Sequence, residues 1–163
     1  ALASNEFIKN TLKKGRAGTA MMARPDLNAQ QVEDIVSYLR SAPGVEVKRI
    51  PVDPRKKFNG SMAEGEHKFA IYCASCHGAN GEGYTIGMPG TSIGLAGFLD
   101  TASDDYIYQT LKHGRRGTPM KSFLGSEGLA NLNEKDAHDI IAHIRTLPSK
   151  QKTAATGGAE SFE

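Results

Sequence analysis

One stretch of this chain occurs twice, which constrains its fold more than any other feature. The sequence TLKKGRAGTAMM near the N-terminus returns as TLKHGRRGTPMK about 100 residues later. When residues 1–22 are aligned with residues 100–121, eleven of the 22 positions are identical. Residues 27–43 then align with residues 132–148 and share six of 17 positions. Identity this dense, in sequence that is not of low complexity, predicts two related structural units.

Three helices are predicted in the second copy. The first follows Ser61, which forms a capping-box pattern with Glu64, and it runs to the cysteines. The second begins after Ser103 and ends at Gly114. The third begins after Asn133, carries one apolar stripe at helical spacing and ends at a proline.

The first copy has counterparts of only the last two helices, in SNEFIKNTLKKG and NAQQVEDIVSYLRSAP. No run of strands is predicted, so the fold class is mostly α. Residues 44–60 are rich in proline and charge and are predicted to form a linker. Residues 149–163 are small, polar and unpatterned, and we expect them to be a mobile tail.

Composition narrows the function. The 163 residues suffice for one ordinary domain or two small ones, but they include only 6 Phe, 5 Tyr and no Trp. A large bound cofactor would supply the apolar surface that such a chain lacks. The net charge of +2 is too small to indicate nucleic-acid binding. No apolar run is long enough to predict a membrane span.

The pentapeptide CASCH holds both cysteines of the chain, Cys73 and Cys76, followed by His77. A structural zinc site would need a second pair of ligands, which is missing. A thioredoxin-like dithiol would need a preceding strand and a parallel sheet, and neither is predicted. Covalent haem attachment needs two thiols for the two vinyl groups and a histidine directly after the second. We therefore interpret CASCH as a haem c attachment site with His77 as the proximal iron ligand.

A second axial ligand is expected because haem iron has two axial positions. Met120 lies in a loop, after a helix-ending glycine and a proline, without the apolar spacing of a core methionine. His113 is its main rival, although its place at a helix C-terminus equally suits a charge–dipole role or solvent exposure. The weaker candidates are His67, His138, His143, Met62 and Met88.

Residues 60–148 resemble a class I c-type cytochrome domain. The matching pieces are YCASCHGANGEG, Pro89 in a glycine-rich segment, FLDTASDDYIYQTLKHGRRGTPM and the last amphipathic helix. The resemblance implies three main helices around a covalent haem, with a complete haem c domain at residues 61–148. It also implies that Pro89 accepts a hydrogen bond from His77 and that the Met120 sulfur is the sixth iron ligand. With both axial positions filled, the domain is expected to be an electron carrier, not an enzyme.

The loop around Met120 is basic, through Lys112, Arg115, Arg116 and Lys121. The resemblance places the exposed haem edge near this loop, so these side chains are candidates for docking an acidic redox partner. A solvated surface, with one arginine pairing with a haem propionate, is the alternative.

Residues 1–43 resemble the distal half of the same domain, and Met21 aligns with Met120. No Cys or His precedes His67, so these residues alone cannot assemble a haem site. We expect the chain to be the C-terminal part of a longer dihaem cytochrome, with Met21 as a candidate ligand of a second haem. The alternatives are a natural domain without haem and a half-domain completed by another chain.

The expected function is electron transfer through a His/Met-ligated haem c, in a dihaem cytochrome or in a cytochrome subunit of a respiratory complex. The expected partners are redox proteins, with a membrane respiratory complex among the candidates, and not nucleic acid. The family implies a periplasmic or extracytoplasmic location in a bacterium. The alternatives are a haem subunit of a catalytic oxidoreductase, of the peroxidase or thiosulfate/nitrite type, and a docking subunit whose first unit is structural.

Overall fold

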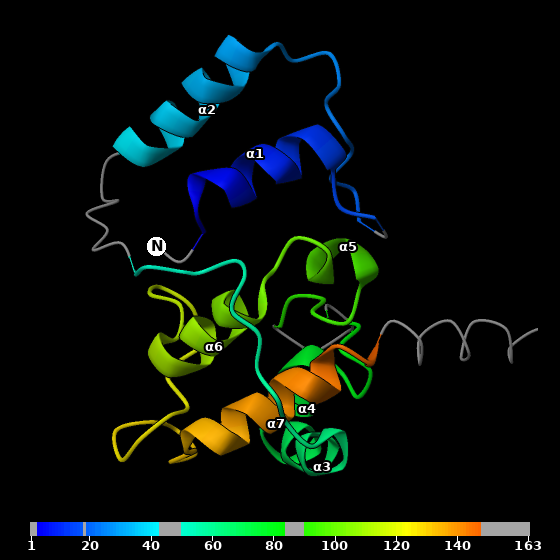
Figure 1. Ribbon diagram of the computed structural model, residues 1–163, viewed down its shortest axis with the longest axis vertical. Helices are drawn as coiled ribbons and strands as arrows, with labels where there is room; N and C mark the ends of the chain where they lie inside the picture. Colours follow the sequence, from blue (N-terminus) through cyan, green and yellow to red (C-terminus); the bar gives the residue numbers. More distant parts are fainter. Residues whose placement is uncertain (1–2, 18, 43–49, 84–89, 148–163) are drawn as a thin grey trace, which may run out of the picture.

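The computed structural model describes residues 3–17, 19–42, 50–83 and 90–147. Within these ranges the elements are α1 (Asn5–Lys14), α2 (Ala29–Ser41), α3 (Met62–Tyr72), α4 (Ala74–His77), α5 (Ala96–Leu99), α6 (Asp104–His113) and α7 (Glu134–Ile144), shown in Figure 1. In the described residues, β-structure is limited to an isolated bridge between Leu124 and Leu132. The mostly α prediction is therefore confirmed. None of the described helices has the length and apolarity needed to cross a membrane.

Helices α1 and α6 span equivalent residues, and α2 and α7 begin at equivalent residues, although α7 ends two positions earlier than α2. Helices α1 and α6 each follow a serine N-cap, Ser4 or Ser103, whose side chain accepts a backbone N–H of the first turn. Both helices end at a glycine with positive φ, 65° at Gly15 and 67° at Gly114. Helices α2 and α7 each begin at an asparagine that forms a complete capping box. The sequence repeat is thus a structural repeat.

The loop that follows α1 closes with the same hydrogen bonds as the loop that follows α6. The N–H of Arg16 donates to the backbone oxygen of Met21 at 2.8 Å, and the N–H of Arg115 donates to that of Met120 at 2.6 Å. In both loops the threonine N–H donates to the arginine carbonyl at 3.1 Å. Its hydroxyl donates to the same carbonyl at 2.8 Å in each loop. The loop shape is therefore determined by its own residues.

The core of the second unit lies where α3 crosses α7. Gly65 allows the close approach, because a Cβ at this position would lie 1.9 Å from the backbone oxygen of Asp139. The side chains of Phe69, Ile140 and Ile141 fill the crossing and are fully buried. This crossing fixes the end of α3, and with it the start of CASCH.

Asp139 changes the predicted capping box at Ser61. The Ser61 hydroxyl accepts the N–H of Glu64 at 3.3 Å, as predicted. The reciprocal bond to the Ser61 N–H is replaced, because this N–H donates to Asp139 Oδ1 at 2.8 Å. Lys135 and Lys68 donate to Oδ2 of the same carboxylate at 2.7 and 3.1 Å. The long-range contact prevails over the local one.

The segment before α3 packs along the second unit from residue 50 onward. Ile50, Val52 and Phe58 contact its core. The Phe58 ring stacks on His138 with a centroid separation of 4.3 Å. The linker predicted for residues 44–60 is therefore bound to the second unit over its described part, 50–60. The predicted mobile tail, residues 149–163, lies outside the described residues.

The two units meet through their equivalent helices, and α1 lies between α2 and α6 in Figure 1. Phe7 of α1 stacks on Tyr106 of α6 with centroids 5.0 Å apart and an interplanar angle of 12°. These residues occupy the same position in the two copies. Beside them, a Cβ at Gly97 would lie 2.3 Å from the Ala17 nitrogen, so α5 touches the loop of the first unit. The interface resembles a two-fold contact within one chain.

Candidate functional site

A cavity of about 540 Å³ lies between the α3–α4 corner and the α6 helix with its following loop. This size falls within the order of 300–1,000 Å³ that is usual for ligand sites. Cys73, Cys76, His77, Met120 and Arg115 all line it. Most of the remaining lining is apolar and includes Ile93, Phe98, Ile107, Leu111, Phe123 and Ile144. The structure thus brings the candidate attachment and ligand residues to one apolar cavity.

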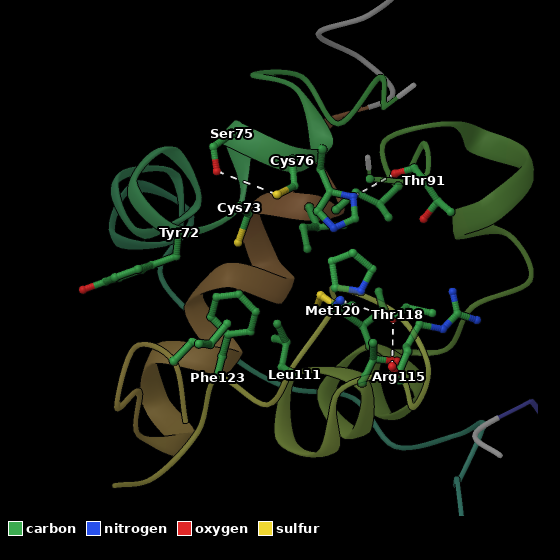
Figure 2. Close-up of a pocket in the computed structure, with 18 of the residues that line it drawn as sticks. Tyr72, Cys73, Ser75, Cys76, Thr91, Leu111, Arg115, Thr118, Met120 and Phe123 are labelled. Carbon is green, nitrogen blue, oxygen red and sulfur yellow. Dashed lines mark hydrogen bonds between the residues drawn. The ribbon is translucent and has the colours of Figure 1, made fainter. Parts of the chain in front are cut away.

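The cysteines are held by a single helical turn. Cys73 caps α3, and its N–H donates to the Phe69 backbone oxygen at 2.9 Å. The N–H of His77 then donates to the Cys73 backbone oxygen at 2.9 Å, which closes α4. In Figure 2, Cys73 and Cys76 lie on the α4 side of the cavity and Met120 lies across from them. Two thiols and an imidazole from one short turn can therefore act on one bound group.

The orientation of the His77 ring is fixed by a hydrogen bond to the Thr91 backbone. Its Nδ1 lies 2.8 Å from the backbone oxygen of Thr91, and a carbonyl only accepts, so Nδ1 carries the hydrogen. Nε2 is then the atom with the free lone pair, as in iron-ligating histidines. Burial lowers the pKa of His77 and the charge of Arg115 adds to this, while the bond to Thr91 acts the other way. A neutral imidazole is thereby favoured.

Pro89, predicted as the acceptor for His77, lies outside the described residues. The acceptor in the structure is Thr91, two residues further along the same segment. The backbone can approach the ring because residue 90 is a glycine. A Cβ there would lie 2.3 Å from the Cys76 backbone oxygen and 2.8 Å from His77 Nδ1.

The Cys73 thiol is uncharged in this environment. Burial, and then the neighbouring Cys76, raises its pKa to about 12. Zinc binding and dithiol redox chemistry both use thiolates, often with a lowered pKa, so this environment opposes them. A thioether carries no charge and suits a buried position. The attachment cysteines therefore fit a covalently held haem. Over the described residues, no group of three or more His, Cys, Asp or Glu side chains is placed to hold a metal ion.

Met120 lies half-buried in the cavity wall opposite α4. Its N–H donates to the Thr118 hydroxyl at 3.2 Å, so the residue is held by its own loop. The rival ligand His113 is exposed and is not part of the cavity lining. His67 and Met62 are exposed, while His138 and His143 pack against Phe58 and Phe69. Met88 lies outside the described residues.

The four predicted docking residues differ in their surroundings. All four residues are exposed, but two of them also have a described side-chain contact. Lys112 lies over the Tyr108 ring, with Nζ 5.9 Å from the centroid. Arg115 lines the cavity, and its NH2 group donates to the Tyr106 hydroxyl at 3.0 Å.

Three residues of the site were not identified as such from the sequence. Tyr106 is not among the candidate site residues of the sequence analysis, yet its hydroxyl accepts a hydrogen bond from Arg115. Phe98 lies on α5, a helix too short to show apolar spacing. Thr91 acts through its backbone oxygen, which no side-chain pattern can reveal.

Met21 occupies the equivalent place in the first unit, in more open surroundings. The residue is 37% exposed. Leu39, which aligns with the cavity residue Ile144, is 45% exposed, whereas Ile144 is 3% exposed. The face of the first unit that corresponds to the cavity wall is therefore open.

Comparisons with known proteins point to one family. Residues 60–144 match the family model described as cytochrome c oxidase, cbb3-type, subunit III. The chain is 27% identical over 150 residues to the cbb3-type cytochrome c oxidase subunit FixP of Azorhizobium caulinodans, covering 82% of this chain and 47% of that protein. It is 32% identical over 97 residues to the cytochrome bc1 complex cytochrome c subunit of Corynebacterium diphtheriae, covering 60% of this chain and 30% of that protein. The chain thus spans less than half the length of these relatives.

A solved structure shares the fold. The Kuenenia stuttgartiensis reducing HAO-like protein complex Kustc0457/Kustc0458 contains a chain that superposes with a TM-score of 0.59. The sequence identity is 21%, and the match covers 88% of this chain and 72% of that one. Because 88% exceeds the share occupied by the second unit alone, the likeness includes both units.

Proposed function

The chain belongs to the c-type cytochrome family described by the cbb3-type oxidase subunit III model, and on this premise we propose that it carries electrons through one covalently bound haem c. The observation that carries the proposal is the apolar cavity in which CASCH faces Met120. Family membership accounts for the haem c, and the cavity accounts for how this chain holds it.

Each site residue has a proposed role. Cys73 and Cys76 form the two thioethers, which require no charge on the buried sulfur. His77 binds the iron through Nε2, since Nδ1 is committed to Thr91. Met120 provides the distal sulfur from a loop that is closed by its own hydrogen bonds. Pro89 remains a proposed contact of the proximal histidine.

The bound haem c supplies one-electron oxidation and reduction. The residues of the chain that hold the haem would determine its properties. Ligation by the Met120 thioether and the His77 imidazole would raise the potential relative to ligation by two imidazoles. Apolar burial would also raise the potential, because the extra charge of the ferric form is poorly solvated there. If His77 and Met120 both bound the iron, no position would be left for a substrate, and the domain would act as a carrier.

The absorption spectrum of the oxidised protein tests this ligation. We expect the weak band at the red end of the visible range that accompanies methionine–iron bonding. It should disappear in Met120→Ala and persist in His113→Ala, the matched control. Binding of carbon monoxide by the reduced wild-type protein would show an open or displaceable site, and would favour a catalytic haem subunit instead.

Partners and location are proposed from the relatives and from the charge of the distal loop. Lys112, Arg115, Arg116 and Lys121 form a basic rim that would attract an acidic redox protein or an acidic part of a respiratory complex. Both curated relatives are named as subunits of such complexes. An extracytoplasmic location in a bacterium agrees with this assignment. Electron-transfer rates that do not change with ionic strength would contradict the docking role.

The first unit is proposed to be the distal half of a second haem site, with Met21 as its axial ligand. Its loop has the hydrogen bonds of the Met120 loop, and its open face corresponds to the wall of the cavity. A CxxCH segment outside the 163 residues would supply the proximal half. Haem counting with intact-mass measurement on native protein tests this proposal. Two haems are expected, and a single haem would contradict it.

A further inference from the structure

Four side chains form a column from the first unit to the haem cavity. The Arg16 guanidinium lies over the Phe7 ring at 5.0 Å from the centroid. Phe7 stacks on Tyr106 at 5.0 Å. The Tyr106 hydroxyl accepts a hydrogen bond from Arg115 at 3.0 Å, and Arg115 lines the same cavity as His77. The contacts are continuous from α1 to the site.

We propose that the first unit positions Arg115 at the cavity through the Phe7–Tyr106 stack and thereby raises the reduction potential of the haem. This inference rests on the proposed haem between His77 and Met120. It gives Phe7, which lies outside the haem domain, a positioning role in electron transfer. It also gives the first unit a function that does not depend on a second haem.

The direction of the effect follows from charge. Ferric haem has one more positive charge than ferrous haem, so a nearby cation disfavours the ferric form. Arg115 is the basic side chain of the distal loop that lines the cavity.

The stack can control Arg115 because Tyr106 has little freedom. Tyr106 is buried between Phe7 on one face and the edge of Phe98, whose centroid lies 6.4 Å away. A fixed hydroxyl holds the guanidinium to one position, whereas an arginine side chain otherwise has many rotamers. Arg115 is an exposed residue, so its guanidinium stays at the cavity only while the Tyr106 hydroxyl holds it. Without Phe7, Tyr106 would lose its stacking partner, and the guanidinium would spend more time away from the cavity, where solvent and salt screen its charge.

The test is the midpoint potential of the haem in the 163-residue chain, which has one CASCH site. Arg115→Gln is expected to shift the ferrous/ferric ratio at fixed potential about tenfold toward ferric, a fall of about 59 mV for one electron. Phe7→Leu is expected to shift it in the same direction by about threefold. Tyr38→Leu is the matched control, because Tyr38 is an aromatic residue of the first unit that is 72% exposed, and it should cause no shift.

A double-mutant cycle separates positioning from simple loss of packing. If Phe7 acts through Arg115, Phe7→Leu should have no further effect in the Arg115→Gln background. An equal shift in both backgrounds would overturn the proposal, because it would show that Phe7 acts by changing solvent access. An unchanged potential in Phe7→Leu alone would overturn it as well.

Phe7→Leu could separate the first unit from the second, which limited proteolysis would reveal. Tyr106→Phe tests the positioning role in that event. This variant keeps the ring and its stack but removes the acceptor of Arg115. It should lower the potential, and the shift should shrink as ionic strength rises. A wild-type potential in Tyr106→Phe would refute the positioning role. If the wild-type protein itself lacked the methionine–iron band, the proposed function would be contradicted instead. Failure of the positioning role and failure of the proposed function are therefore distinguishable.

Discussion

The buried carboxylate of Asp139 ties the start of α3 to α7, and its replacement by asparagine tests how much this tie stabilises the haem domain. The side chain of Asp139 is 1% exposed. Burial alone would raise its pKa, but hydrogen bonds from Lys135, the Ser61 N–H and Lys68 outweigh burial and lower it from 3.8 to about 2. Asparagine keeps the shape and an oxygen for the Ser61 N–H, so Asp139→Asn removes mainly the charge.

The lowered pKa of Asp139 gives the size of the expected loss of folding free energy. A change from 3.8 to about 2 is equivalent to about 2 kcal/mol of folding free energy in the ionised state. Because the folded-state pKa lies below the unfolded one, this contribution is complete above about pH 4 and is lost as the pH falls toward about 2. We expect Asp139→Asn to destabilise the domain by about 2 kcal/mol at neutral pH, and the difference from wild type to shrink toward zero in acid.

Urea unfolding of the haem-loaded chain, followed by haem absorbance at several pH values, measures both parts of this prediction. Asp34→Asn is the matched control. Asp34 aligns with Asp139 but is exposed, and it accepts only the Gln30 side-chain amide at 2.9 Å among the described contacts. Its replacement should change stability by less than about 0.5 kcal/mol. Equal stability of Asp139→Asn and wild type at neutral pH would refute the reasoning, as would a difference that persists at about pH 2.

Three further substitutions test the helix crossing, the α6 N-terminus and the segment behind the proximal ring. Gly65→Ala should lower the urea midpoint, with a cost of about 1–3 kcal/mol, because its Cβ would overlap the α7 backbone; stabilisation, as at an open helix position, would contradict the close approach. Arg145→Gln should lower the melting temperature by removing about 3 kcal/mol, since Asp104 is buried, Arg145 Nε donates to its Oδ1 at 2.8 Å and the Arg145 NH2 group forms an ion pair with the same oxygen at 2.6 Å; an unchanged melting temperature would show that the pair is not needed. Gly90→Ala should reduce haem incorporation, measured as haem per protein, because a Cβ would press on the His77 ring; wild-type haem content would contradict this.

Features encoded by neighbouring residues could be predicted from the sequence. The serine and asparagine caps, the terminating glycines and the apolar spacing gave the five longer helices close to their observed bounds. The repeat predicted that the two units correspond, and the CASCH pattern predicted which residues carry the thiols of the site. The caps, the apolar spacing and CASCH each depend on residues close together in the sequence, and the repeat is found by comparing the sequence with itself, so none of these signals requires knowledge of the fold.

Contacts between distant residues could not be predicted. The Ser61 N–H was assigned to Glu64 and instead binds Asp139, 78 positions away. The stack of Phe7 on Tyr106 joins residues 99 positions apart, and no local sequence pattern predicts it. Residues 50–60 looked like a free connection because they are rich in proline and charge, yet their three large apolar side chains pack on the core. These outcomes depend on the tertiary arrangement and not on local preference.

The two distal loops close in the same way, although one faces a cavity and the other an open surface. The position of the methionine is therefore prepared before any iron is near it. If Met120 binds the iron as proposed, its sulfur would need little rearrangement to reach the metal, because the loop is already closed by its own hydrogen bonds. The same closure would keep the rearrangement small when the iron changes its oxidation state, which rapid electron exchange requires.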